Sequence, residues 1–318
     1  MAESWMRHVQ QLVDVASRYY VDGASQADIA HEIHVSRPTV SRLLSEARDS
    51  GVVTIRIEHP MRRQSHLERQ LIDRFGLTDA WVPRVDSGLP TEAVARCAAV
   101  IVADTVRDDS VVAISNGTTL AELIAELEKL PAARHRESIV VPMIGALGSD
   151  NLLVDGPDLC RRIADCLGGT YRILPTPLIV GAPRLAAALR TEVSIATTLS
   201  LASRADVAVV GIGTCDNTGS GRIFDGWMTR SINQRLLEQG AVGHIAGHHF
   251  DAQGRHIKSD LCERTIGIAP ERLAEMPNVV AVVAGTNKVS AILGALRGGY
   301  IQSLVIDDET AARVLASA

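Results

Sequence analysis

The sequence contains few aromatic residues and no closely spaced cysteines. Phe, Trp and Tyr account for only 3% of the 318 residues, so a folded core must be built mostly from Val, Ile, Leu and Ala. The five cysteines are odd in number and widely separated, without a Cys-x-x-Cys pair, which argues against a disulfide framework and a thiolate zinc site. No apolar run approaches the ~20 residues that a membrane-spanning helix needs.

Lysine is scarce as well. The only lysines are Lys129, Lys258 and Lys288, so nearly all positive charge comes from arginine. The formal net charge of −5 gives no overall indication of nucleic-acid binding, and charge has to be examined locally. The N-terminus has no charged-then-apolar signal sequence, and we expect a cytoplasmic protein. The length suits one small and one large domain.

The first fifty residues predict three consecutive helices. The apolar positions of residues 6–20 follow helical spacing, and Gly23 is expected to end this helix. Ser25 is suited to cap a second helix, whose apolar side chains lie on one side. Ser36 is suited to cap a third helix with Pro38 in its first turn, where a missing N–H costs little.

The third helix is expected to end at Gly51, and the alternating segment VVTIRIE (residues 52–58) reads as a short strand or wing. Helix, tight turn, capped helix and wing make up the winged helix-turn-helix layout. Its recognition helix, here the third helix of the chain, enters the DNA major groove. Arginines outnumber acids between residues 33 and 63, which predicts a basic face. A structural or dimerisation module with solvated arginines is the alternative. The residues assigned to DNA binding are Ser25, Gln26, Ser36, Arg37, Pro38, Thr39, Ser41 and Arg42.

Residues 61–77 read as a linker helix between a DNA-binding domain (residues 1–60) and an effector-binding domain (residues 78–318). In the second domain strand-like and helical segments alternate, which predicts an α/β fold with a doubly wound, mainly parallel sheet. The expected strands are Ala80–Val85, Val111–Ser115, Ile139–Met143, Val207–Gly211, Val279–Ala284 and Ser303–Ile306. The expected helices are Glu92–Val106, Leu120–Leu130, Leu159–Leu167, Met228–Gln239, Val289–Leu296 and Glu309–Leu315.

Ligands of such sheets bind beyond the carboxyl ends of the strands. The segment VVAISNGTTLAELIAEL passes there from a strand through a small polar loop into a helix. Asn116 and Gly117 allow close approach to the backbone, and Thr118 and Thr119 place hydroxyls beside free helix N–H groups, which suits a phosphate or a polyol. An ordinary capped turn between strand and helix is the alternative.

Two further strand ends carry candidate residues. VVAVVAGTNKVSAILGAL repeats the arrangement with Lys288 at its mouth, either as a phosphate or sugar contact or as a surface lysine. In VAVVGIGT, Gly211 and Gly213 permit close backbone approach, although a tight turn explains them equally well. Neither a Gly-x-x-x-x-Gly-Lys-Ser/Thr loop nor a Gly-x-Gly-x-x-Gly after a strand occurs, so nucleotide binding is not indicated and no cofactor is expected.

The order of these pieces resembles the SorC family of sugar-responsive bacterial transcription regulators, often described as DeoR-like. The resemblance rests on SQADIAHEIHVSRPTVSRLL, SNGTT, VPMIGALGSDN, LGGTYRILPTPLIV, VVGIGT, GAVGHIAGHHFDAQG and AGTNKVSAILGALRGGYIQSLVID, which together cover nearly the whole chain. It implies a winged helix-turn-helix followed by an effector domain similar in fold to ribose-phosphate isomerases and glucosamine-phosphate deaminases. It also implies a homodimer or homotetramer whose operator binding responds to a sugar, polyol or sugar phosphate.

The resemblance assigns roles to individual residues. Gly117, Thr118 and Thr119 would hold a phosphate or terminal hydroxyls, Lys288 would close over the same group, and the loop at residues 243–246 would contact the carbon chain. The family usually has an acid at the position of His244, and an imidazole offers one donor and one acceptor instead. Some members that bind phosphates carry an arginine in the loop VPMIGALG, which has none here, so a doubly phosphorylated effector is disfavoured.

Four histidines gather in the segment GAVGHIAGHHFDAQGRH. On a helix, His244 and His248 would be possible zinc ligands, but the glycines predict strand, turn and strand around residues 251–254. Within one strand, residues four apart lie ~13 Å from each other, too far to share an ion. We therefore expect no metal, a sugar contact by His244, and solvated positions for His248, His249 and His256.

A sugar-phosphate isomerase or deaminase that carries a DNA-binding module is the competing class. Its chemistry needs a carboxylate base over the sugar carbons. Spacing pairs no acid with Lys288, although Asp216, Asp225 and Asp251 could approach in three dimensions. A helix-turn-helix has no role in an isomerase, which favours a sensor without turnover over both the enzyme and a DNA-bound scaffold with an inert pocket. We predict a regulator of a carbohydrate or polyol operon, whose partners are operator DNA and a small effector.

Overall fold

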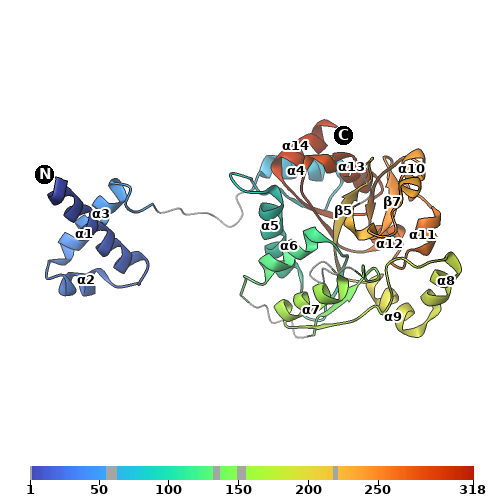
Figure 1. Cartoon of the computed structure of the whole chain (residues 1–318), viewed down its shortest axis with the longest axis horizontal. Coiled ribbons are helices and arrows are strands. Elements are labelled where there is room, and N and C mark those ends of the chain that lie inside the picture. Colours follow the sequence, from blue (N-terminus) through green and yellow to red (C-terminus); the bar gives the residue numbers. More distant parts are fainter. Residues whose placement is uncertain (1, 55–62, 132–136, 149–154, 218–220) are drawn as a thin grey trace. The chain divides into compact units, whose positions relative to one another are not determined.

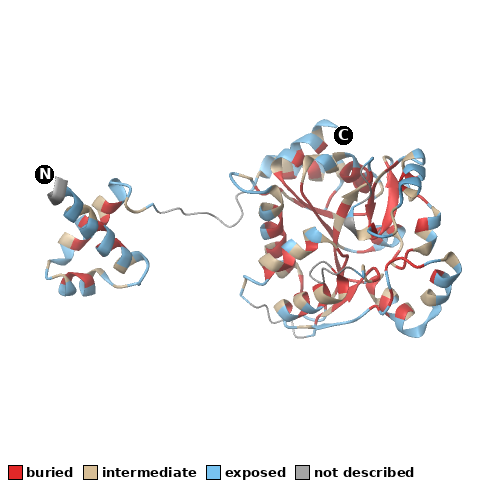
Figure 2. Ribbon diagram, in the orientation of Figure 1, coloured by how far each residue is buried: buried red, intermediate tan, exposed pale blue. Residues whose placement is uncertain are grey.

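The computed structural model describes residues 2–54, 63–131, 137–148, 155–217 and 221–318. The chain divides into two compact units, Met1–His59 and Pro60–Ala318 (Figure 1). Each unit has its own buried interior, which Figure 2 shows in red. Among the described residues, no helix combines the length and the apolar character needed to cross a membrane.

The small unit consists of three helices, as predicted: α1 (Ala2–Tyr20), α2 (Gln26–Glu32) and α3 (Arg37–Asp49). Ser25 caps α2 in a reciprocal arrangement with Asp28. The Asp28 N–H donates to Ser25 Oγ, and the Asp28 carboxylate accepts the Ser25 N–H. Two donors that the start of a helix leaves without partners are satisfied in this way.

The connection between α2 and α3 is tight, with His34 at a φ of 56°. At the start of α3, Ser36 Oγ accepts the Thr39 N–H at 3.4 Å, and Pro38 occupies the first turn. Apolar side chains from all three helices pack together, including Leu12, Val15, Ile29, Val40, Leu43 and Leu44. Of the predicted wing, residues 52–54 form no strand, and residues 55–58 lie outside the described residues.

The helix expected in the linker is α4 (Ser65–Phe75), and it belongs to the large unit. It packs against β1 (Asp79–Trp81) and α14 (Asp308–Ala316). Arg63 Nε and Nη2 donate to the buried Glu68 carboxylate at 2.6 and 2.7 Å. This two-point ion pair holds the start of α4 at the edge of the sheet.

Among the described residues of the large unit, seven parallel strands form the centre, in the order β1-β9-β8-β5-β2-β3-β4. Two antiparallel strands extend the sheet, β6 beside β5 and β7 beside β6. Besides β1, the strands are β2 (Val111–Ile114), β3 (Ile139–Pro142), β4 (Thr170–Tyr171), β5 (Val207–Thr214), β6 (Ala241–Ile245), β7 (His248–Asp251), β8 (Val279–Val283) and β9 (Ser303–Ile306). The strand order reverses between β2 and β5.

Helices cover both faces of the sheet. On one face lie α5 (Pro90–Thr105), α6 (Thr118–Leu127) and α7 (Gly156–Leu167). The opposite face carries α4, α14, α9 (Val193–Ala202), α10 (Arg230–Glu238) and α13 (Val289–Arg297). The remaining helices are α8 (Pro183–Thr191), α11 (Asp260–Arg264) and α12 (Pro270–Glu275).

Alternate residues of the central strands point to these two layers. In β5, Val207 and Val209 pack with α5 to α7, whereas Ala208 and Val210 pack with the opposite layer. Both sets are buried, which explains why the parallel strands read as continuous apolar runs. The predicted α/β fold with a mainly parallel sheet is confirmed.

Each of the six predicted strands and six predicted helices is present; β9 has the predicted ends, and the others differ by up to four residues at an end. The largest difference is β1, which ends at Trp81 instead of Val85. In the segment of residues 241–256, the predicted turn around residues 251–254 is present, and the chain after it pairs with β7 only through an isolated bridge from Phe250 to His256. A hairpin turn at Ala246 and Gly247, between β6 and β7, was not predicted.

Candidate functional site

A cavity of about 540 Å³ opens where the parallel strands end. Its walls come from the loops after β2, β3, β5 and β8 and from the β6–β7 hairpin. This position coincides with the reversal of strand order between β2 and β5, where α/β sheets bind their ligands. All of the residues predicted from the sequence to bind effector line it: Asn116, Gly117, Thr118, Thr119, Gly213, His244 and Lys288.

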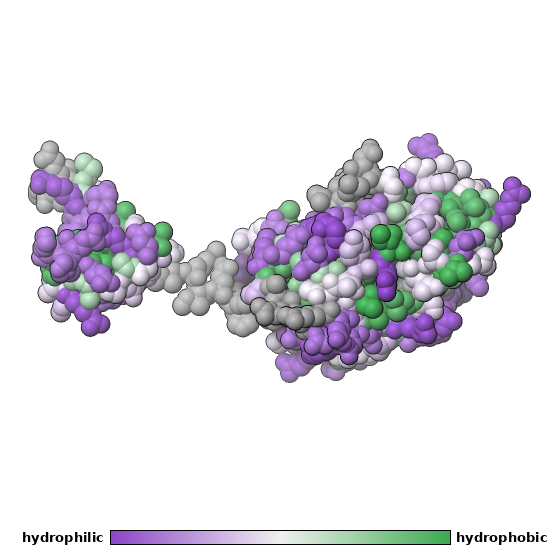
Figure 3. Space-filling view, turned by 90° about the horizontal axis from the view of Figure 1, so that it is seen from below, coloured by the Kyte–Doolittle hydropathy of each residue, from purple (hydrophilic) through white to green (hydrophobic). Residues whose placement is uncertain are grey.

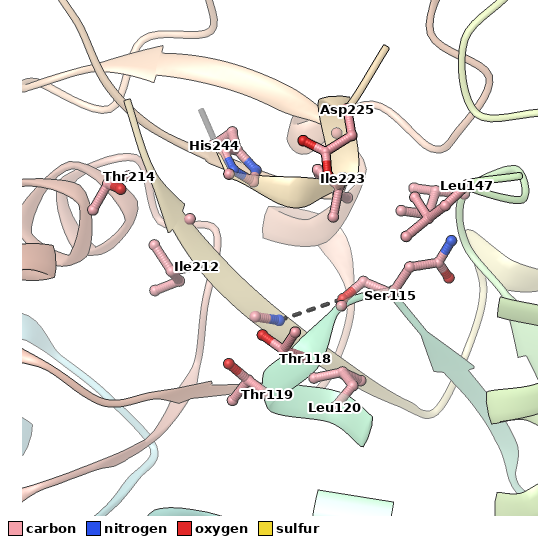
Figure 4. A pocket seen from close by; sticks show the side chains of 18 of the residues that line it. Ser115, Thr118, Thr119, Leu120, Leu147, Ile212, Thr214, Ile223, Asp225 and His244 are labelled. Carbon is pink, nitrogen blue, oxygen red and sulfur yellow. Dashed lines mark hydrogen bonds between the residues drawn. The ribbon is translucent and has the colours of Figure 1, made fainter. Parts of the chain in front are cut away.

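The loop after β2 is fixed by hydrogen bonds to its neighbours. Ser115 Oγ accepts the Gly211 N–H at 3.3 Å (Figure 4), which ties this loop to β5. Asn116 is buried, and its Nδ2 donates to the Gly145 carbonyl at 3.0 Å, which ties the loop to the end of β3. Asn116 Oδ1 is a buried acceptor with no partner among the described residues.

The loop then enters α6 through a conformation that only glycine adopts readily. Gly117 has φ 127° and ψ 171°. No side chain caps the start of α6, so its first N–H groups are open to the cavity that Thr118 and Thr119 line. Free N–H groups and the positive end of the helix dipole attract anions, and the two hydroxyls add further hydrogen-bonding groups.

Lys288 supplies the positive charge of the cavity. It ends a short 3-10 turn, Thr286–Lys288, which follows β8. Its side chain is half-buried and forms no ion pair with a described residue. Removal from water lowers the pKa of the ammonium, while the carboxylates of Glu122 and Asp307 oppose this shift. A cation held in this way is available to an anionic ligand.

His244 forms the opposite wall. It lies on β6 directly across from Gly213 on β5, and its imidazole lies against the glycine backbone. The ring contacts Phe224 edge to face, with centroids 4.9 Å apart. Phe224 in turn stacks on His249 at 4.8 Å. Burial lowers the pKa of His249 well below its usual value, so this supporting ring is neutral.

Sequence reasoning missed the apolar lining residues Leu147 and Ile223. Asp225, one of the three acids considered as a base, brings the one carboxylate among the described lining residues. Figure 4 shows His244, Ile223 and Asp225 on one side of the cavity and Thr118 and Thr119 on the other. Leu147 belongs to an irregular loop and Ile223 to a short 3-10 turn, and neither gives a periodic signal in the sequence.

The other two acids considered as bases lie elsewhere. Asp251 Oδ1 accepts the N–H groups of Gln253 and Arg255, and its Oδ2 pairs with Arg255 Nε at 2.7 Å. The main-chain carbonyl of Asp216 accepts from Asn233 Nδ2. Neither acid lines the cavity, so the enzyme hypothesis has only one candidate base among the described residues there.

The histidines are distributed differently from the prediction. His244 and His248 do not share one strand, because the turn at residues 246–247 separates them. Both His248 and His249 are buried instead of solvated. Burial and the neighbouring His256 lower the pKa of His248 to about 3. The argument that His244 and His248 are too far apart to share an ion assumed a single strand, and that assumption is wrong.

The residues assigned to DNA binding lie at the start of α2 and in the first half of α3. Arg37, Ser41 and Arg42 are exposed, and neither arginine forms an ion pair with a described residue. Ser25 and Ser36 act as helix caps, as predicted. Figure 3 shows a mostly hydrophilic surface on the visible face of the small unit.

Comparisons with known proteins agree over nearly the whole chain. The family model described as "Putative sugar-binding domain" matches residues 59–316. The transcriptional regulator LsrR of Klebsiella pneumoniae is 30% identical over 307 residues, which span 96% of this chain and 92% of that protein. The deoxyribonucleoside regulator of Bacillus subtilis is 29% identical over 309 residues, which span 96% and 97%.

A solved structure extends the likeness to three dimensions. The crystal structure of the full-length sorbitol operon regulator SorC from Klebsiella pneumoniae matches with a TM-score of 0.78 and 27% identity. The match spans 96% of this chain and 98% of that one. With the family model covering most of the large unit, the chain belongs to the SorC family of transcriptional regulators with a sugar-binding domain.

Proposed function

We propose that this protein is a DNA-binding transcriptional regulator whose operator affinity is controlled by a sugar, polyol or sugar phosphate. The observation that carries the proposal is the convergence of the predicted effector residues on one cavity. These residues come from three separate strand ends and a hairpin. A common function in ligand binding explains why polar and glycine residues occupy those ends together.

The two sides of the cavity suit two kinds of ligand group. The open N-terminus of α6, the two threonines and Lys288 favour a phosphate or another anion. Opposite them, Asp225 and His244 offer acceptors and donors for hydroxyls. The apolar residues between them suit a carbon chain. A phosphorylated sugar or polyol suits the cavity, because the cavity volume lies within the ~300–1,000 Å³ typical of small-molecule sites.

The small unit would bind the operator as a winged helix-turn-helix. In this proposal α3 enters the major groove, with Arg37, Ser41 and Arg42 toward base edges or phosphates. The two exposed arginines, free of ion pairs with described residues, support this assignment. The large unit, in turn, would have the fold of ribose-phosphate isomerases and glucosamine-phosphate deaminases, with its mainly parallel sheet as support.

The proposed mechanism is a shift between two states of a homodimer or homotetramer. Effector binding favours one arrangement of the subunits and so changes the spacing of paired recognition helices. Each arginine-to-guanine contact that is lost costs about 1–3 kcal/mol. A modest change in spacing therefore suffices to release the operator, as in a repressor.

A ligand screen tests the proposal. The full chain is heated with sugars, polyols and their monophosphates, beside Lys288→Ala and a Thr118→Ala/Thr119→Ala variant. We expect one phosphorylated compound to raise the melting temperature of the wild type and to lose this effect in both variants. The same compound should then change operator affinity in a gel-shift titration. If no compound in the library changes either property, the proposal fails.

Chemical turnover of the bound compound distinguishes an enzyme from a regulator. Asp225 is a possible base, and its presence in the cavity is the one observation in favour of catalysis. We propose that the effector is bound and released unchanged. Nuclear magnetic resonance spectra of the compound after prolonged incubation should show no product. Product that disappears in Asp225→Asn would instead establish an isomerase or deaminase.

A further inference from the structure

Three potential metal ligands meet outside the effector cavity. His248 Nδ1 lies 3.3 Å from Cys262 Sγ, and His256 Nε2 lies 3.2 Å from the same sulfur. The ligand atoms of all three side chains lie within 4.8 Å of one another. None of the three residues lines the effector cavity, so that function does not account for the cluster.

The cluster is built from three different pieces of backbone. His248 begins β7, and His256 follows the chain's return beside that strand, held by a bridge to Phe250. Cys262 lies on α11, whose start is capped by Ser259 Oγ. His248 is buried and the other two residues are half-buried, so the arrangement is fixed by packing and has an open side.

An acidic residue orients one of the histidines. His256 Nδ1 lies 3.0 Å from Glu271 Oε1, while its other nitrogen faces the sulfur. A carboxylate that accepts the far N–H of an imidazole fixes the tautomer whose second nitrogen carries the lone pair. Histidine ligands of zinc commonly have such a partner, because it makes the ligand nitrogen more basic.

We propose that His248, His256 and Cys262 bind a single zinc ion. Zinc takes nitrogen ligands at about 2.0–2.1 Å and thiolate at about 2.3 Å in a tetrahedron, so its nitrogen and sulfur ligands lie about 3.5 Å apart. The observed separations of 3.2 and 3.3 Å need to open by only a few tenths of an ångström. Water completes the tetrahedron from the open side, and the Cys262 thiol gives its proton to solvent on binding.

The charges around the cluster suit a dication. The Cys262 thiolate and Glu271 together offset the two positive charges of zinc. Arg190 is the nearby cation, and its positive charge favours a lower pKa of both His248 and Cys262. Its guanidinium donates to the Thr265 and Glu263 carbonyls. A borderline-soft ion with thiolate and imidazole ligands is the expected occupant, because magnesium and calcium require oxygen ligands.

Cobalt is the probe for this site because its spectrum reports both geometry and sulfur. The full chain is reduced, freed of metal with a chelator and titrated with Co²⁺. We expect one equivalent to produce the strong visible bands of tetrahedral cobalt and a near-ultraviolet sulfur-to-cobalt charge-transfer band. One equivalent of Zn²⁺ should remove both.

Variants assign the spectrum to the cluster. Cys262→Ser is nearly isosteric and should abolish the charge-transfer band, whereas Cys166→Ser, at another half-buried cysteine, should retain it. Glu271→Gln should weaken zinc affinity by about 10–100-fold without removing the band. Circular dichroism confirms that each variant is folded.

Two results would overturn the proposal. One is a folded wild type that binds cobalt only with the weak spectrum of surface sites, without the charge-transfer band. The other is a band that survives Cys262→Ser. Both results are independent of the effector screen, because the cluster and the cavity share no residue.

Discussion

His244 occupies space that any side chain at Gly213 would need. The two residues face each other across β5 and β6, and a Cβ atom on Gly213 would lie 1.9 Å from His244 Nε2. Glycine is therefore required at this position for a steric reason, in addition to any approach of a ligand. The imidazole and the glycine form one unit of the cavity wall.

Gly213→Ala should displace the His244 ring and destabilise the protein by about 1–3 kcal/mol, the usual cost of overpacking. Effector affinity should fall as well, because the ring leaves the wall. Urea unfolding and calorimetric titration measure the two effects. In a His244→Ala background the same glycine substitution should cost much less, since the clash has been removed. An equal loss of stability in both backgrounds would show that the clash with His244 is not its cause.

Gly211→Ala is the matched control for folding. Gly211 lies two residues earlier on the same strand, lines the same cavity, and has open space where a Cβ would be. Its substitution should leave the free energy of unfolding nearly unchanged. A loss of stability as large as that of Gly213→Ala would show that the effect comes from glycine in the strand and not from His244.

Lys288→Ala should weaken binding of an anionic effector by about 10–100-fold, which corresponds to the 1.5–3 kcal/mol of a hydrogen bond to a charged group. Lys258→Ala is the control, because this lysine is exposed and does not line the cavity. Isothermal titration measures both affinities. A similar loss in the two variants would indicate that general positive charge, and not contact in the cavity, attracts the effector.

Affinity for a phosphorylated effector should fall at alkaline pH. Burial lowers the pKa of Lys288, and the opposing groups that face it are Glu122 on α6 and Asp307 before α14. The cation that binds the phosphate is thus lost at a lower pH than it would be for an exposed lysine. Phosphate is already a dianion above pH ~8, so its own titration does not interfere.

Lys288→Arg provides the comparison for that pH dependence, because arginine keeps its charge throughout. Titrations between pH 8 and 10 should show declining affinity for the wild type and nearly constant affinity for the variant. If affinity declined with pH equally in both proteins, a group other than Lys288 would control the pH dependence.

Arg37→Ala and Arg42→Ala should each weaken operator binding by about 1–3 kcal/mol if the arginine reads a base. A phosphate contact would instead lower the slope of log affinity against log salt by about one unit. Arg48→Ala serves as the control at the far end of α3, where Arg48 donates to Tyr20 and Ser45. Gel shifts at several salt concentrations distinguish the cases, and unchanged binding in both test variants would refute the proposed DNA face.

Much of the fold follows from local sequence rules. The central parallel strands are buried on both faces, so runs such as VVAVV stand out without any alternation. Residues at the ends of these runs, including Asn116 and Lys288, meet because parallel strands bring their carboxyl ends to one edge. For this reason one line of reasoning predicted both the sheet and the residues that share the cavity.

The parts that escaped prediction depend on contacts distant in sequence. The turn at Ala246 and Gly247 was not predicted, although Gly247 at φ 79° is an ordinary turn glycine. His248, His256 and Cys262 have no spacing typical of a zinc motif and come together only in the folded chain. Neither their proximity nor the burial of His249 has a signature in the linear pattern.

The β6–β7 hairpin supplies one wall of the cavity, while the ends of the parallel strands and the loops that follow them supply the rest. Selectivity for a small molecule can therefore change by substitution on the hairpin, with the framework that folds the domain left intact. Because recognition and folding depend on different elements, the domain can be engineered into a biosensor that responds to a different small molecule. Libraries at position 244, built with glycine retained at 213, would vary the recognition surface at the least cost in folding.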